Sequence, residues 1–407
     1  RVGRSSLVFD GSGDCINVSN ESNFDFTSGD FTLEAWVKPE DVGGQKILFS
    51  KVYDGNYYTG YYVGIASSGQ VYGGLWGGPS YASQQVSLYA SVNCNDGQWH
   101  HVAMVRHGNV WTMYVDGVAE STVNSSVGPA NNNYPLRMGR IYGDNYPTQD
   151  QFAGYMDEIR VSNVARYTSD FTAPLAEHVN DANTLLLIHS NAGNGIGGDA
   201  SGLGHHFTAN NLAGHDITLD SPLTSFATFS GVDLAASSLS EGNLKYTHSG
   251  GWSPFARLTK SFTTGKWYAE VVMYGLGGSY PDDSAAVLVE TGGAVGAIYY
   301  TDGDKGDNVP FAASWHNGDV IGVAVDADAG TVDYYKNNTL QGSQSITAST
   351  ETKISVHGWS FQSYLNAGQD PTFSGNKVGQ SVAPNEGAGR FYYQPPAGYK
   401  ALVDVNY

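Results

Sequence analysis

The stretch DGQWHHVAMVRHGNVWTMYVDG, residues 96–117, decides how this chain folds, because it fits either a metal or catalytic site or the frame of a β-sandwich. Its apolar and polar residues alternate with a period of two, which is the spacing of a β-strand. Successive side chains of a strand point to opposite faces, so His101 shares a face with Ala103 and Val105, whereas His100 lies with Met104 on the other face. The two histidines therefore cannot bind one ligand together.

Turn residues divide the stretch into a hairpin. His107-Gly108-Asn109 predicts a turn between two strands, and Asp116-Gly117 predicts a second turn after the return strand. With apolar neighbours on its face, His101 is better explained as a buried core histidine than as a catalytic residue. The pattern favours a scaffold role for the whole stretch.

Similar alternation recurs along the chain and predicts an all-β protein. In DFTLEAWVKP (30–39), Phe31, Leu33, Ala35 and Val37 fall on one face, and Pro39 ends the run. Residues 60–76 predict two strands around a turn at 67–69, and residues 152–161 and 184–190 predict further strands. The first 175 residues show no pattern for a helix of more than two turns.

Length and composition agree with this class. A chain of 407 residues is expected to form two domains or one large one. Hydrophobic residues make up 41% and charged residues only 14%, with 52 glycines and 27 tyrosines, a mixture typical of short strands joined by turns.

Charge and cysteine content limit the partners. The formal net charge of −19 repels polyanions, which excludes nucleic acid as an expected partner, and no apolar run is long enough for a membrane span. Cys15 and Cys94 are too few for a disulfide scaffold or a structural zinc site, and they could form one bridge or remain free. The chain begins at Arg1 rather than Met, so we expect it to be processed or excerpted.

Five blocks, in this order, resemble laminin-G-like domains: SLVFDGSGDCINV (6–18), GDFTLEAWVKP (29–39), DGQWHHVAMVR (96–106), MYVDG (113–117) and FAGYMDEIRVSNVARYT (152–168). These domains are jelly rolls of the concanavalin A-like lectin/glucanase fold. The resemblance covers residues 5 to about 175 and implies a first domain over 1–176. Cys15 departs from the pattern, because such domains more often carry an aromatic residue there.

A second sandwich is expected over residues 226–407. GKWYAEVVM (265–273), the hairpin at 317–338 and YLNAGQDPTF (364–373) resemble SPRY domains, which are also concanavalin A-like sandwiches. Between the two sandwiches, residues 177–225 are rich in Gly, Asn and Asp and predict a connector. The expected architecture is therefore two concanavalin A-like antiparallel β-sandwiches (jelly rolls) in tandem.

Two segments resemble SPRY-containing structural proteins of tailed, in particular marine, bacteriophages: HDITLDSPLTSFATFS (215–230) and FYYQPPAGYKALVDVN (391–406). This resemblance implies a virion protein of tail-fibre, baseplate or head-fibre type that binds a host-surface glycan or envelope protein. Other virion proteins would then be partners, and a homo-oligomer is expected. A secreted bacterial adhesin at the cell surface is an alternative.

Catalysis is not expected. Glycosidases need two carboxylates that flank the scissile bond, and the glucanase string Glu-x-Asp-x-x-Glu is missing from the sequence. Asp157 and Glu158 are adjacent on a predicted strand, so their side chains should diverge. A polysaccharide depolymerase remains the alternative to a binding protein.

The laminin-G-like resemblance also implies a structural Ca²⁺ where the first strand meets the strand that carries Asp-Glu. By motif, its ligands would be Asp10 in FDG and Asp157 in YMDE, completed by backbone carbonyls and water. The alternative is that Asp10 stabilises a glycine turn and Asp157 caps the end of a strand.

Aromatic residues in turn-rich loops are the candidate ligand-binding residues, because sugar rings stack on aromatic planes. The candidates are Tyr57, Tyr58, Trp76, Tyr81, Tyr142 and Tyr146. The alternative is that these side chains close the rims of the sandwich.

Overall fold

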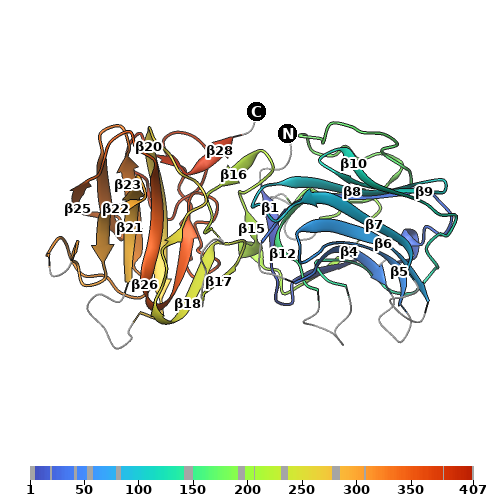
Figure 1. Ribbon diagram of the computed structural model, residues 1–407, viewed down its shortest axis with the longest axis horizontal. Helices are drawn as coiled ribbons and strands as arrows, with labels where there is room; N and C mark the ends of the chain where they lie inside the picture. Colours follow the sequence, from blue (N-terminus) through green and yellow to red (C-terminus); the bar gives the residue numbers. More distant parts are fainter. Residues whose placement is uncertain are drawn as a thin grey trace. The chain divides into compact units, whose positions relative to one another are not determined.

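The protein is described by a computed structural model in which the chain forms two compact units, Arg1–Leu223 and Thr224–Tyr407 (Figure 1). The structure describes residues 5–405 apart from 19–20, 41–43, 53–57, 79–83, 142–149, 191–197, 206, 231–236, 277–284, 307–308 and 379. Strands account for 52% of the residues and helices for 2%, which confirms the predicted all-β class.

Two antiparallel sheets form the first unit. In the described residues, the eight-stranded sheet has the order β10 (Val118–Asn124), β9 (Val110–Val115), β8 (His100–His107), β3 (Phe31–Pro39), β12 (Ala153–Ser162), β1 (Ser6–Asp10) and β15 (Ile217–Thr218), with β13 (Thr184–Ile188) beside β12. The seven-stranded sheet has the order β14 (Phe207–Asn210), β2 (Cys15–Val18), β11 (Leu136–Met138), β4 (Lys46–Val52), β5 (Tyr58–Ile65), β6 (Gln70–Gly78) and β7 (Gln84–Asn93). Short 3-10 turns lie at Glu21–Phe24 (η1) and Gly214–Asp216 (η3).

The core of this unit lies between the two sheets. Phe31, Leu33, Ala35 and Val37 of β3 all enter it, as the alternation predicted, and residues such as Leu88 of β7 enter it from the other sheet. The predicted hairpin at 96–117 is also confirmed, because β8 pairs with β9 from Val102↔Val115 to His107↔Val110. Burial of these apolar side chains is the main term that stabilises the sandwich.

The outer face of β3 is buried as well, because a segment of the chain covers it. Residues 163–183, which we name the covering segment, run across the eight-stranded sheet. The backbone carbonyl of Val164 accepts a hydrogen bond from the Thr32 hydroxyl (2.8 Å), and that of Pro174 accepts one from Nε1 of Trp36 (3.0 Å). Further along the chain, the carboxylate of Asp220 pairs with Nζ of Lys38 at 3.1 Å.

The structure differs from the expected connector over 177–225. β13 pairs with β12 and confirms the strand predicted at 184–190. Two further pieces are strands that the composition did not predict: β14 pairs with β2, and β15 pairs with β1. The physical reason is that the open edges of β1 and β2 offer unpaired backbone groups, which any residue type can satisfy. The division between the units falls between Leu223 and Thr224.

The second unit is built around the long strand β26 (Thr352–Asn366). The described strands of its main sheet have the order β17 (Ser237–Ser240), β18 (Lys245–Trp252), β26, β20 (Lys266–Tyr274), β23 (Val320–Asp326), β24 (Thr331–Lys336) and β25 (Thr339–Ser345). The first half of β26 pairs instead with β19 (Ala256–Arg257) and β21 (Ala285–Thr291), and β21 continues to β22 (Ala294–Tyr300). Shorter pieces are β27 (Lys400–Ala401), parallel to β20, and a ribbon of β16 (Thr224–Phe226) with β28 (Val403–Val405).

The predicted hairpin at 317–338 appears as β23 and β24, and Ile321, Val323 and Val325 enter the core of the second unit.

The carboxyl group of Glu270 is buried in the second unit. Glu270 on β20 accepts hydrogen bonds from the backbone N–H groups of Tyr392 (2.7 Å) and Tyr393 (2.8 Å). This carboxyl group therefore fastens a late segment of the chain to the sheet.

Two general expectations can be compared with the structure. Cys15 and Cys94 are both buried, and no disulfide bridge joins them. No helix in the described part of the chain is both long and apolar enough to cross a membrane.

The Lys38–Asp220 pair allows a test of how the chain around Asp220 is held on β3. Both side chains are almost fully buried, so replacing Asp220 with Asn should leave the ammonium group of Lys38 without a counter-charge and cost about 3–5 kcal/mol of unfolding free energy. Urea denaturation followed by tryptophan fluorescence measures this loss. The double variant Lys38→Met/Asp220→Asn should recover part of it, and equal stability of Asp220→Asn and the wild type would contradict the pairing.

Glu270 should make the second unit depend on pH. Burial raises the pKa of Glu270 to about 7 from an ordinary value of 4.5. Folding thus favours the protonated form, so its stabilising contribution is complete below pH 4.5 and is lost as the pH rises through 7, by about 3 kcal/mol. Protection factors of the Tyr392 and Tyr393 amides, which correct for the intrinsic pH dependence of hydrogen exchange, should fall across this range in the wild type. Glu270→Gln should remove this fall and the exposed control Glu351→Gln should keep it; an unchanged profile in Glu270→Gln would contradict the assignment.

Candidate functional site

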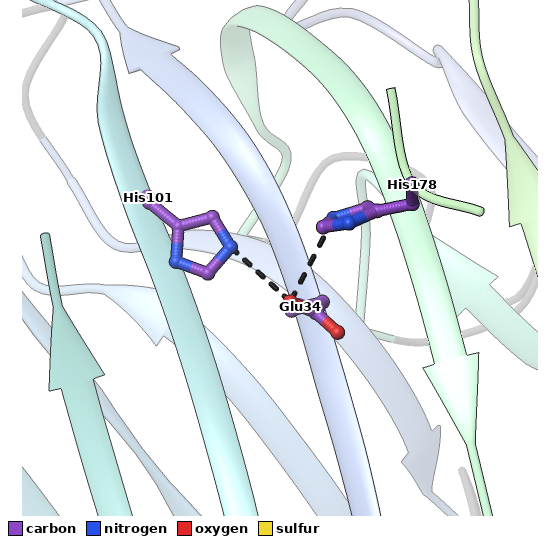
Figure 2. A group of neighbouring side chains, drawn as sticks. All are labelled: Glu34, His101 and His178. Atoms are coloured by element: carbon purple, nitrogen blue, oxygen red, sulfur yellow. Dashed lines mark ion pairs between the residues drawn. The ribbon is translucent and has the colours of Figure 1, made fainter. Parts of the chain in front are cut away.

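Three metal-ligating side chains meet on the covered face of the eight-stranded sheet: Glu34 of β3, His101 of β8 and His178 of the covering segment (Figure 2). Oε2 of Glu34 lies 3.2 Å from Nε2 of His101 and 3.7 Å from Nε2 of His178. All three residues are buried. Since β3 and β8 are neighbours and the covering segment lies over them, the fold alone brings these residues together.

Glu34 already has other partners. Nε and Nη2 of Arg160 both lie 2.7 Å from its Oε1, and the hydroxyl of Tyr167 donates to its Oε2 at 2.7 Å. Burial opposes the ionisation of Glu34, but the contact from His101 and the charge of Arg160 hold its pKa below its usual range. Burial lowers the pKa of His178 to about 3. At neutral pH the carboxylate is therefore ionised and the imidazole of His178 is neutral.

The spacing of the three ligand atoms resembles that of ligands around one tetrahedral zinc ion, which has bonds of about 2.0–2.2 Å. The charge does not favour such an ion, because Arg160 already neutralises Glu34. A divalent cation would leave two net positive charges in a dry interior, which costs several kcal/mol per ion. We therefore interpret the cluster as a polar clamp that holds the covering segment on the sheet.

A bulge in β12 positions His178. The register between β12 and β3 shifts between Asp157 and Arg160, and Glu158 within this bulge has a positive φ of 49°. Its Oε2 accepts the backbone N–H of His178 at 2.7 Å, and its Oε1 lies 2.8 Å from Nδ1 of His189. Glu158 therefore holds two later residues, His178 of the clamp and His189, with its two carboxylate oxygens.

The structure does not bring Asp10 and Asp157 together. Asp10 lies opposite Ala153 in the β1–β12 pairing, four residues along β12 from Asp157, so the two are separated by about 13 Å. Oδ1 of Asp10 accepts the backbone N–H of Ser12 at 2.6 Å, which is a turn role. Burial raises the pKa of Asp157 well above its usual range. One ion cannot bridge the two aspartates, and calcium binding by this unit stays a prediction.

The predicted aromatic ligands have different positions. Tyr57, Tyr81, Tyr142 and Tyr146 lie outside the described residues. Tyr58 begins β5, where it pairs with Gly78. Trp76 is only 6% exposed, and its ring stacks on Tyr62 with the centroids 4.0 Å apart. The ring of Trp76 therefore packs against the sheet and offers little surface to a ligand.

Trp76 belongs to a row of aromatic rings on the outer face of the seven-stranded sheet. Tyr62 and Tyr72 continue the row (centroids 5.6 Å apart), and Tyr89 of β7 stacks on Tyr72 at 5.7 Å and 23°. Each of the inner rings lies opposite a glycine of the neighbouring strand, in the pairs Trp76↔Gly60, Tyr62↔Gly74 and Tyr72↔Gly64. A Cβ at Gly64 would come within 3.0 Å of the Tyr72 ring, so the glycines leave the space in which the rings lie flat.

Tyr89 is the open end of this row. It is 53% exposed, whereas Tyr62 and Tyr72 are buried. Ser87 and Ser91 are exposed on the same face of β7, and the Ser91 hydroxyl donates to the carboxylate of Glu120. An aromatic plane supported from below and surrounded by hydroxyl and carboxylate groups is suited to a sugar ring, which offers apolar C–H faces and hydroxyl groups.

Sequence reasoning missed Tyr89, although the sequence contains a signal for it. In QQVSLYASVN (84–93), Val86, Leu88 and Ala90 form the buried phase of the strand. Tyr89 is the one aromatic residue in the exposed phase, between Ser87 and Ser91. The alternation of this strand could therefore have shown Tyr89 as an aromatic residue on an exposed face.

The clamp predicts that the first unit loses stability in acid. Because the pKa of His178 is about 3 in the folded chain and 6.5 ordinarily, its stabilising contribution is complete above pH 6.5 and declines as the pH falls toward 3, by about 3 kcal/mol at pH 4. Urea midpoints measured from pH 7 to 4 should fall less in His178→Gln than in the wild type. The exposed control His107→Gln should follow the wild type, and parallel curves for His178→Gln and the wild type would contradict the clamp.

One family model and several solved structures are similar to parts of this chain. A family model described as the concanavalin A-like lectin/glucanases superfamily matches residues 10–170. No curated protein matches the chain. Among solved structures, a presumed carbohydrate binding protein from Bacteroides ovatus is 18% identical, with a TM-score of 0.39. That match covers 51% of this chain and 58% of the other, so the chain spans less than two thirds of that protein.

Two further solved structures are smaller than this chain. The SPRY domain of human HERC1 is 18% identical (TM-score 0.28), and the match covers 34% of this chain and 96% of that domain. The CBM40 of an IT-sialidase from Ruminococcus gnavus is 12% identical (TM-score 0.33), with coverage of 40% and 93%. From the five sequence blocks, the two packed sheets and the family match, the first unit of this chain has the concanavalin A-like lectin fold.

Proposed function

We propose that this protein is a non-enzymatic glycan-binding protein and that the face around Tyr89 is a binding surface of its first unit. The observation that carries the proposal is the exposed ring of Tyr89, supported by Tyr72 and flanked by serine hydroxyl groups. A tyrosine held by stacking loses little conformational freedom when a sugar binds. The lectin-like fold of residues 10–170 is consistent with this role.

The charge of the protein favours neutral glycans. A net charge of −19 repels acidic polysaccharides at low ionic strength and does not oppose the binding of neutral sugars. A single exposed ring binds a sugar weakly, so attachment to a surface would require several copies. Assembly into a homo-oligomer would supply this avidity.

Two carboxyl groups support the non-enzymatic part of the proposal. Asp157 and Glu158, which are adjacent in sequence, are both buried. The carboxylate of Glu158 is occupied by His178 and His189. Neither group is placed to flank a glycosidic bond of a bound polysaccharide. A depolymerase remains the alternative function, and shortening of a polysaccharide during incubation would favour it.

We further propose that the protein acts on a virion, as a tail-fibre, baseplate or head-fibre component that binds a host-surface glycan or envelope protein. This proposal rests on the resemblance of residues 215–230 and 391–406 to structural proteins of tailed bacteriophages. A secreted adhesin would bind glycans through the same surface. Electron microscopy of particles labelled with an antibody against this chain separates the two.

The surface is tested with Tyr89 variants of the full chain. Saturation-transfer NMR with the methyl glycosides of glucose, galactose and mannose, and affinity electrophoresis in gels containing dextran, galactan or mannan, measure binding. Tyr89→Ala should weaken binding about tenfold, equivalent to about 1.4 kcal/mol, whereas Tyr89→Phe keeps the ring and should bind like the wild type. Binding that is equal in Tyr89→Ala and the wild type would exclude this face.

A further inference from the structure

The second unit carries a separate group of aromatic rings, which forms where β18 meets β26. Trp252, the last residue of β18, lies opposite Trp359 in the strand pairing. His357 precedes Trp359 by two positions and so lies on the same face of β26. Phe255 follows β18 and packs its ring edge-on against His357, with centroids 4.9 Å apart.

The rings hold Trp252 in a fixed position. Its indole stacks on the imidazole of His357 (centroids 5.0 Å apart, interplanar angle 17°) and contacts Trp359 edge-on at 6.3 Å. Trp252 is nevertheless 41% exposed. The imidazole therefore covers one face of the indole, and a large part of the Trp252 side chain remains open to solvent. Because the ring is already held, little rotamer freedom is lost when a ligand stacks on it.

A bulge leaves space beside this ring. The register between β18 and β26 shifts between His248 and Trp252, across Gly250 and Gly251, which have φ values of 81° and 108°. A Cβ added at either glycine would meet no atom within 4 Å. The backbone N–H of Gly250 donates to the Ser360 hydroxyl at 3.1 Å. The backbone at Gly250 and Gly251, which leads into Trp252, therefore has open space beside it and contacts the Ser360 hydroxyl.

Charged groups lie on the other side of the rings. The guanidinium of Arg257 is 5.7 Å from the centroid of the Phe255 ring, and its Nη2 lies 2.8 Å from the carboxylate of Glu290. Glu290 also accepts a hydrogen bond from the Ser355 hydroxyl. The side chain of Arg257 is 37% exposed next to Phe255, so those guanidinium N–H groups that do not bond Glu290 can bond solvent or a ligand.

We infer that the rings around Trp252 form a second glycan-binding site, which takes a neutral pyranose ring. A flat apolar plane with donors and acceptors at its edge matches the C–H face and hydroxyl groups of a sugar. The Arg257 guanidinium is paired with Glu290, so its positive charge is largely neutralised and favours an acidic ligand little. The inference deepens the proposed function, because a chain with one weak site on each unit binds a polymeric glycan with avidity.

Single variants of the full chain separate the two sites. Trp252→Ala, Tyr89→Ala and the double variant are compared with the wild type by affinity electrophoresis in dextran, galactan or mannan gels. Tryptophan fluorescence is titrated with the methyl glycosides of the same sugars, and Trp252→Phe serves as the conservative control. Urea midpoints equal to that of the wild type confirm that each variant folds, as expected for exposed residues.

Trp252→Ala should weaken binding to the polymer about tenfold and abolish the sugar-dependent change in fluorescence, while Tyr89→Ala keeps that change. The double variant should bind less than either single variant. Binding and fluorescence that are unchanged in Trp252→Ala, with a loss in Tyr89→Ala, would overturn this inference and leave the proposed function intact. The converse pattern would move glycan binding to the second unit alone, and no binding of any probe by the wild type would overturn both proposals.

Discussion

The first unit depends on the burial of a polar strand face. The inner side chains of β3 form part of the sandwich core, and its outer side chains Thr32, Glu34, Trp36 and Lys38 are buried too. A buried polar group that lacks a partner costs roughly 1–3 kcal/mol, and more if it is charged, so this face is stable only when each group is satisfied. The covering segment and Asp220 supply those partners, and Glu34 is the centre of the arrangement because it joins His101, Arg160, Tyr167 and His178.

The same constraint distinguishes the outer faces of the two sheets. In the eight-stranded sheet, the outer face around β3 and β8 is covered by the covering segment. The seven-stranded sheet carries instead a row of flat aromatic rings that ends in the exposed Tyr89. The residues that stabilise the unit therefore lie on one sheet, and the residues proposed to bind a glycan lie on the other.

The two units share one local arrangement of aromatic rings. In each, an exposed aromatic ring stacks on a second ring: Tyr89 on Tyr72 in the first unit and Trp252 on His357 in the second. Glycines of the neighbouring strand or of a bulge leave room beside these rings. Such a ring is rigid before a ligand arrives, which reduces the entropy lost on binding. The net charge of −19 disfavours acidic ligands at both proposed surfaces.

Local patterns in the sequence determined the strands. Period-two alternation identified β3, the β8–β9 hairpin, β12 and the β23–β24 hairpin, because burial of one face of a strand leaves its signature in adjacent residues. The same alternation separated His100 from His101. The alternation of residues 84–93 also contains the exposed position of Tyr89, which our search for ligand residues in turn-rich loops missed.

Only the tertiary structure decided which strands pair and which residues of distant segments lie next to each other. The Gly- and Asn-rich composition of residues 177–225 predicted a connector, yet β14 and β15 complete the sheets of the first unit through backbone hydrogen bonds that carry no residue code. Asp10 and Asp157 belong to paired strands, and only the register shows that they are four residues out of line. Glu34, His101 and His178 meet although 67 and 77 positions separate them in turn, because contacts between distant segments depend on how the sheets are covered, which no local period encodes.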